Sequence, residues 1–142
     1  MNYEIISATL DDVADIKKIE DECFSVPWSE KSITESLNNP CSHFYVAKDG
    51  ENAMGYIGIQ IFSGEGYFTN VATLPEYRKQ GIAKALIERA LENEMEFLTL
   101  EVRESNLPAI NLYEKLGFAE VGRRPKFYRE PDEDAILMTK YL

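Results

Sequence analysis

The chain is poor in the residues that build metal centres and disulfide frameworks. Its 142 residues include two cysteines, Cys23 and Cys41, and one histidine, His43. The cysteine spacing matches neither a zinc motif nor a redox motif, and no cluster of His, Cys and Asp has metal-ligand spacing. We therefore expect two reduced thiols, a structural or exposed histidine, and no bound metal.

Long apolar runs, repeats and low-complexity segments are also missing. No run approaches the roughly 20 apolar residues that a membrane-spanning helix needs. The first twelve residues lack the basic and apolar regions of a secretory signal. Hydrophobic residues make up 44% and charged residues 28% of the chain, as in ordinary globular proteins. The sequence predicts one cytoplasmic domain, residues 1–142, that does not enter a membrane.

Basic residues are fewer than acidic ones. The chain has 15 Lys and Arg against 25 Asp and Glu, so its formal net charge is −10. Nucleic-acid binding requires a basic face, so we expect no direct nucleic-acid partner. An acidic surface favours a cationic substrate or partner, although solubility alone would also explain the charge. Against this background, Arg78, Lys79 and Lys84 form a basic cluster around Gly81.

Hydrophobic patterning predicts seven strands and four helices in the order β-α-α-β-β-β-α-β-α-β-β. The expected strands cover residues 3–8, 43–50, 53–62, 66–74, 96–103, 118–130 and 134–142, and the expected helices cover 9–23, 30–37, 81–91 and 105–117. Residues 63–66 should form a hairpin turn, and residues 130–134 an acidic turn. This pattern predicts the α/β (α+β) class, with a mixed sheet and helices on its faces.

Residues at the predicted helix ends support these assignments. Thr9 and Asp12 have the spacing of a capping box, and Ser29 can cap the second helix. Ser105 or Asn106 can cap the last helix, which Gly117 should end.

The segment 77–86, YRKQGIAKAL, joins a strand to a helix through a glycine. The first amides of a helix have no intrahelical partner, and the helix dipole makes its N-terminus attractive to anions. Gly81 allows close backbone approach, and the basic side chains can add charge-assisted contacts. On these residues alone, a phosphate site and a solvated basic turn are both open.

Residues 78–83, RKQGIA, resemble the R/Q-x-x-G-x-G/A signature of the GNAT superfamily of N-acetyltransferases. Residues 100–118, LEVRESNLPAINLYEKLGF, resemble its second hallmark, a strand followed by Asn-x-x-Ala and Tyr-x-x-x-Gly-Phe. The segments FSVPWSEKSI, LEVRESN and DEDAILM are most similar to the ribosomal-protein-alanine N-acetyltransferases. Ala83 replaces a glycine found in many members, and the ENEME segment, residues 92–96, is short.

The resemblance implies a mostly antiparallel twisted sheet of six or seven strands with about four helices and splayed central strands. It implies that the cosubstrate is acetyl-CoA and that the acceptor is the basic N-terminal peptide of a ribosomal protein, the N-terminal alanine of small-subunit protein eighteen. Another protein or a small-molecule amine is the alternative acceptor, and a non-catalytic CoA-binding module is a different class. Short motifs do not distinguish these acceptors.

The resemblance also implies roles for individual residues. The pyrophosphate cradle comprises Arg78, Lys79, Gln80, Gly81, Ile82, Ala83 and Lys84. The pantetheine arm would contact the backbone of Val71, Ala72 and Thr73 and the side chain of Asn106. The N–H group of Val71 would polarise the acetyl carbonyl. Glu101 would accept a proton through water, and Tyr113 would protonate the leaving thiolate.

Each catalytic candidate also has an ordinary structural interpretation. Glu101 lies on one strand face with Phe97, Thr99 and Arg103, where it is either solvated or held in a cleft. Tyr113 could simply belong to the core.

Weaker candidates for a peptide groove are Trp28, Tyr128 and the acidic residues 132–134, among them Asp134. Trp28 could equally be a core anchor.

Overall fold

The computed structural model describes residues 2–129 and 131–142. Its helices are α1 (Val13–Cys23), α2 (Glu30–Asn38), α3 (Ile82–Ala90) and α4 (Leu107–Lys115), with short 3₁₀ turns η1 (Leu10–Asp12) and η2 (Pro75–Tyr77). Its strands are β1 (Glu4–Ser7), β2 (Ser42–Asp49), β3 (Asn52–Phe62), β4 (Glu65–Thr73), β5 (Phe97–Arg103), β6 (Ala119–Tyr128) and β7 (Glu133–Tyr141). The predicted element order is confirmed.

The seven strands form one sheet in the order β1-β2-β3-β4-β5-β7-β6. Every neighbouring pair is antiparallel except β4 and β5, which run parallel. The predicted mixed, mostly antiparallel sheet is therefore confirmed. The single parallel pair is joined through α3, the crossover that parallel neighbours require.

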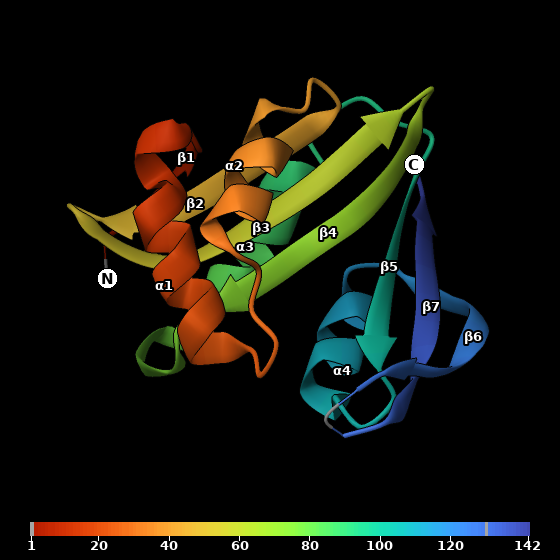
Figure 1. The fold of residues 1–142 in the computed structure, drawn as a ribbon. Helices are drawn as coiled ribbons and strands as arrows, with labels where there is room; N and C mark the ends of the chain where they lie inside the picture. Colours follow the sequence, from red (N-terminus) through yellow and green to blue (C-terminus); the bar gives the residue numbers. More distant parts are fainter. Residues whose placement is uncertain (1, 130) are drawn as a thin grey trace.

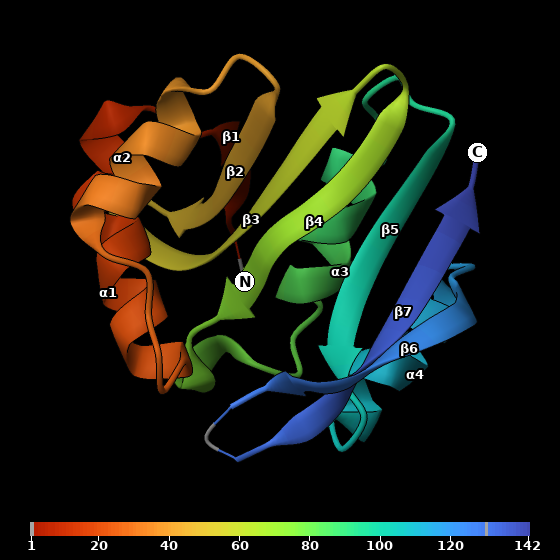
Figure 2. The same cartoon turned by 45° about the vertical axis from the view of Figure 1, so that its right-hand side comes forward.

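Helices cover both faces of the sheet, and Figures 1 and 2 show α1 and α2 on one face and α3 and α4 on the other. Ile16 and Ile19 of α1 and Ile33 of α2 pack on the first face against β2, β3 and the end of β4. The larger core lies on the opposite face, where α3 and α4 cover alternate residues of β5. The apolar residues that recur at helical spacing lie on the buried faces of the helices.

The predicted caps form, with one difference at the first helix. Thr9 and Asp12 make the capping box, but the first turn is 3₁₀ and α1 begins only at Val13. The hydroxyl of Ser29 accepts the Ser32 N–H at 3.1 Å. At α4, Asn106 Oδ1 accepts the Ala109 N–H at 3.3 Å.

The acidic turn predicted over residues 130–134 is shorter than expected. Glu133 and Asp134 belong to β7, and Glu133 pairs with Tyr128 of β6, which leaves Asp132 as the acidic residue of the turn. Glu130 lies outside the described residues.

The sheet opens between β4 and β5. The two strands pair only from Glu65–Phe97 to Tyr67–Thr99, and Figure 2 shows them diverging toward their carboxyl ends. A register shift against β3 leaves Thr69 without a partner there, so β4 contains a bulge. Bulges bend a strand, and this one lies where β4 turns away from β5. The predicted splay of the central strands is thus confirmed.

None of the described helices is long and apolar enough to cross a membrane.

Candidate active site

The opening between β4 and β5 contains a cleft of about 700 Å³. Its walls come from the end of α1 and the following loop, the bulged part of β4, the end of β5, α4 and the β6–β7 hairpin. Of the residues predicted from the sequence, the cleft is lined by Trp28, Val71, Glu101, Asn106, Tyr113 and Tyr128. Residues far apart in the sequence are therefore brought to one place.

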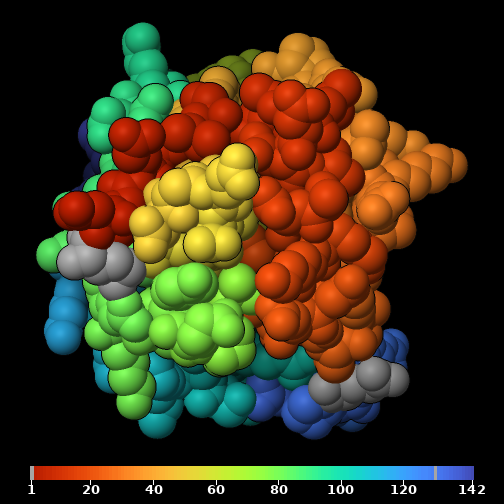
Figure 3. Space-filling model, turned by 90° about the vertical axis from the view of Figure 1, so that its left-hand side faces the viewer, coloured from red at the N-terminus to blue at the C-terminus, as the bar shows by residue number. Residues whose placement is uncertain are grey.

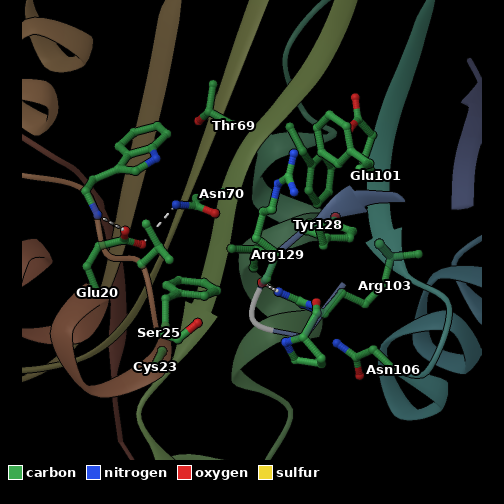
Figure 4. A pocket seen from close by; sticks show the side chains of 18 of the residues that line it. Glu20, Cys23, Ser25, Thr69, Asn70, Glu101, Arg103, Asn106, Tyr128 and Arg129 are labelled. Atoms are coloured by element: carbon green, nitrogen blue, oxygen red, sulfur yellow. Dashed lines mark hydrogen bonds between the residues drawn. The ribbon is translucent and has the colours of Figure 1, made fainter. Parts of the chain in front are cut away.

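Glu101 lies on the open face of β5, because Leu100 and Val102 point into the core on the other side. Its side chain is 30% exposed, and Oε1 lies 3.6 Å from Nε of Arg124 on β6. Figure 4 shows it at the β5 wall, across the cleft from Asn70 on β4. The sequence left open whether Glu101 is solvated on the outer face or held in a cleft, and the structure shows that it lines the cleft.

Tyr113 is both a core residue and a cleft residue. Its ring packs edge-on against Phe68 and Phe118, with centroids 6.0 Å and 5.9 Å away, and only 7% of the residue is exposed. Burial, with a smaller contribution from Tyr128, raises the pKa of the Tyr113 hydroxyl well above its ordinary value. The phenol therefore keeps its proton at neutral pH, as a proton donor must.

The carboxyl-terminal part of β4 has one edge that pairs with no other strand, here called the free edge. Leu74 donates its N–H to the Met54 carbonyl of β3 at 2.9 Å. Since successive amides of a strand point to opposite edges, the Ala72 amide also faces β3. The amides of Val71 and Thr73 face the other edge, from which β5 has diverged. A ligand can pair with this edge as an added strand would.

The first turn of α3 follows the carboxyl end of β4 and has backbone amides without intrahelical partners. Gly81 has φ of +84°, a conformation that side chains disfavour. Ala85 makes the first backbone hydrogen bond of α3, to the Gly81 carbonyl at 3.0 Å. The amides of residues 82–84 consequently lack intrahelical acceptors. Figure 3 shows the segment after β4, in light green, at the surface beside α1, in orange.

Among the basic side chains of this segment, Arg78 has protein partners. Its Nε donates to the Thr73 carbonyl at 2.9 Å, and its Nη2 lies 3.6 Å from Cys23 Sγ. Arg78 thus ties the segment to β4 and α1. Lys79, Gln80 and Lys84 are exposed, and Gln80 Nε2 donates to the Glu76 carbonyl at 3.1 Å.

Of the three weaker substrate candidates, two line the cleft and one does not. Tyr128 and Trp28 are half-buried and line the cleft from opposite sides. Burial, followed by the Glu101 carboxylate, raises the pKa of Tyr128 to about 12. Asp134 does not line the cleft, and its Oδ1 accepts the Lys126 N–H at 2.9 Å within the β6–β7 hairpin.

Of the three charged cleft residues that were not among the sequence candidates, Arg129 is exposed and the other two, Glu20 and Arg103, are not. Glu20 is 1% exposed and lies on the apolar stripe of α1, four residues after Ile16. An acidic residue at that spacing is the sequence signal for a buried, paired carboxylate.

Arg103 is the other, and it connects β5 to the β6–β7 hairpin. It donates to the carbonyls of Arg129 at 2.7 Å and Pro131 at 2.8 Å, and it pairs with Glu133 at 3.4 Å. Its guanidinium also lies 4.6 Å from the centre of the Tyr128 ring. Nothing in the sequence marks these contacts, because they join distant strands.

Comparison with known proteins agrees with this arrangement. Residues 13–118 match the family described as "Acetyltransferase (GNAT) family". The Escherichia coli K12 [ribosomal protein bS18]-alanine N-acetyltransferase is 38% identical over 127 residues, which cover 84% of each chain. An N-alpha-acetyltransferase of Sulfurisphaera tokodaii is 35% identical, over 99% of this chain and 93% of its own.

Solved structures show the same similarity. The crystal structure of the E. coli ribosomal-protein-S18-alanine N-acetyltransferase matches with a TM-score of 0.92 and 30% identity, covering 99% of this chain and 94% of that one. A chain of the NatC complex bound to Gag peptide and CoA matches with a TM-score of 0.87 and 27% identity, over 100% and 99% of the two chains. The resemblance noted from the two motifs is confirmed, and the chain belongs to the GNAT family of acetyltransferases.

Proposed function

We propose that this protein transfers the acetyl group of acetyl-CoA to the N-terminal amine of a protein, and that its preferred acceptor is the N-terminal alanine of ribosomal protein bS18. One observation supports this most strongly. The gap between β4 and β5 brings a free backbone edge, Glu101 and Tyr113 to one cleft. Since the acceptor belongs to the ribosome, we expect the protein to act in the cytoplasm.

The described residues fit acetyl-CoA. The free edge of β4 offers the Thr73 amide to the pantetheine arm, and Asn106 at the head of α4 lines the same cleft. The amides of residues 82–84 and the exposed side chains of Lys79 and Lys84 suit a pyrophosphate. Bound acetyl-CoA supplies an activated thioester carbonyl.

Three groups of the chain then perform the proposed reaction. Glu101 accepts, through water, the proton that the amine loses as its nitrogen bonds to the carbonyl carbon. The Val71 amide stabilises the negative charge on the carbonyl oxygen. As the carbon–sulfur bond breaks, Tyr113 donates its proton to the departing thiolate.

The acceptor is tested by an acetylation assay with mass-spectrometric localisation. Acceptors are a peptide with the bS18 N-terminus, the same peptide beginning with other residues, a peptide with a blocked N-terminus and internal lysines, and polyamines. We expect acetylation at the α-amine, fastest on the alanine peptide. Preferential acetylation of polyamines or lysine side chains would contradict the proposal, and CoA binding without transfer to any acceptor would indicate a non-catalytic module.

A further inference from the structure

The mechanism above does not use the buried carboxylate of Glu20. Three donors from three parts of the chain surround it: the Trp28 N–H reaches Oε1 at 2.8 Å, and the Tyr56 hydroxyl and Asn70 Nδ2 reach Oε2 at 2.7 Å and 2.9 Å. Glu20 therefore joins α1 to the following loop, to β3 and to the bulged part of β4. Figure 4 shows the bond from Asn70 to Glu20.

This arrangement fixes the orientation of the Asn70 amide. The NH₂ group of Asn70 faces Glu20, because its Nδ2 donates to Oε2, the oxygen that also accepts the Tyr56 hydroxyl. Its carbonyl oxygen, Oδ1, must then point away from Glu20 and toward the interior of the cleft, as Figure 4 shows. Within residues 2–129 and 131–142, no donor reaches Asn70 Oδ1. An acceptor atom is thus held ready in the cleft wall.

Asn70 is also next to the backbone group that matters most for transfer. Val71, whose amide faces the open edge, follows it directly, and Glu101 lies on the opposite wall of the same cleft. The attacking nitrogen must come within about 3–3.5 Å of the carbonyl carbon. An oxygen on the residue before Val71 is therefore well placed to hold that nitrogen.

We propose that Asn70 Oδ1 accepts a hydrogen bond from the acceptor's N-terminal amine, and that Glu20 is the positioning residue that turns this oxygen into the cleft. This inference rests on the proposed function. With one N–H directed to Asn70 and another toward Glu101, the lone pair of the amine is left to face the carbonyl carbon. Asn70 thereby selects for an amine that still has hydrogens to donate.

The test compares two partners of the same Glu20 oxygen. Asn70→Leu removes the acceptor, and we expect kcat/KM for the alanine peptide to fall about 10- to 100-fold. The amine nitrogen becomes positively charged as it bonds to the carbonyl carbon, so the lost hydrogen bond is one with a charged donor in the transition state. The KM for acetyl-CoA should not change. Tyr56→Phe, the matched control, removes a buried bond to Oε2 but leaves Asn70 Oδ1 in place. It should keep kcat/KM within about threefold of the wild type.

Glu20→Gln provides a third, conservative variant. A glutamine amide can donate as well as accept, so the Asn70 amide is no longer held in one orientation. We expect a loss of kcat/KM between those of Asn70→Leu and Tyr56→Phe.

A binding measurement separates a substrate contact from a structural role. With CoA present, calorimetry should show that Asn70→Leu weakens binding of the free-amine peptide but not of the N-acetylated peptide. Equal losses for both peptides, or equal losses of kcat/KM in Asn70→Leu and Tyr56→Phe, would overturn the inference while leaving the proposed function intact. Failure of the wild type to acetylate any peptide α-amine would overturn both.

Discussion

The two edges of β4 differ sharply. One edge pairs with β3 through eight register positions, from Gly55–Thr73 to Phe62–Glu65, whereas the other pairs with β5 through only three. The β3 edge holds the strand in the sheet, so the second edge can remain open at its carboxyl end. One side of β4 thus holds the strand in the sheet, and the other side is the one proposed to bind the cosubstrate.

The two walls of the cleft also differ in chemistry. The β4 wall offers backbone groups and an amide oxygen, which are neutral and fixed in place. Across the cleft, β5 and α4 contribute Glu101 and Tyr113, which can move protons. Changes at the end of β4 should therefore act on binding, and changes to Glu101 and Tyr113 should act on rate.

The largest effect is expected at the segment that follows β4. In Gly81→Asp a side chain at φ of +84° costs about 1–2 kcal/mol, and its carboxylate repels the pyrophosphate. We expect calorimetry to detect no acetyl-CoA binding. Gly81→Ala is the control for backbone strain, since a Cβ there meets no atom within 4 Å, and it should still bind measurably. If Gly81→Asp and the wild type bind acetyl-CoA with equal affinity, the pyrophosphate does not bind at this segment.

On the opposite wall, Glu101→Gln removes the proton acceptor. We expect kcat to fall about 10²- to 10⁴-fold, as for loss of a general base, while the Kd for acetyl-CoA stays near the wild-type value. Glu104→Gln is the matched control, because Glu104 lies on the surface in an ion pair with Arg123 and outside the cleft. If both variants turn over at the same rate, Glu101 is not the base.

Tyr113→Phe should lower kcat by a smaller factor, about 10- to 100-fold, because solvent can in part replace the acid. Burial raises the pKa of this hydroxyl, so it stays protonated as the pH rises to 9. The ratio of wild-type to variant kcat should accordingly be the same at pH 7 and pH 9. A ratio that shrinks toward one at pH 9 would show that the wild-type phenol has already lost its proton.

Arg103→Lys should have the smallest effect of this series. A lysine cannot reproduce the two carbonyl contacts and the stacking on Tyr128 together. The β6–β7 hairpin should become less well held, and we expect the peptide KM to rise about three- to tenfold with kcat little changed. Arg123→Lys, whose ion pairs with Glu104 and Glu120 are exposed, should change neither value.

The fold and much of the candidate site could be predicted from the sequence. The helix and strand periods gave the element order, since Leu98, Leu100 and Val102 alternate with polar residues and Ile16 and Ile19 recur at helical spacing. The glycine motif and the Asn-x-x-Ala stretch led to the family and so to the splayed sheet.

What the sequence could not show depends on contacts between distant segments. Nothing in the letters around Thr69 marks the bulge, because a bulge is a register relation with β3. The orientation of Asn70 follows from Glu20, fifty residues away. Asp134 appeared to be a groove residue because acidic residues cluster near it, yet its carboxylate is used by the Lys126 amide.

The free edge of β4 can be tested directly by amide hydrogen exchange measured by NMR, with and without acetyl-CoA. The Ala72 amide faces β3 and should be protected in both states. The Val71 amide should exchange quickly in the free protein and become strongly protected when acetyl-CoA is bound. If acetyl-CoA binds and the Val71 amide remains as fast as before, the cosubstrate does not pair with β4, and the central claim is wrong.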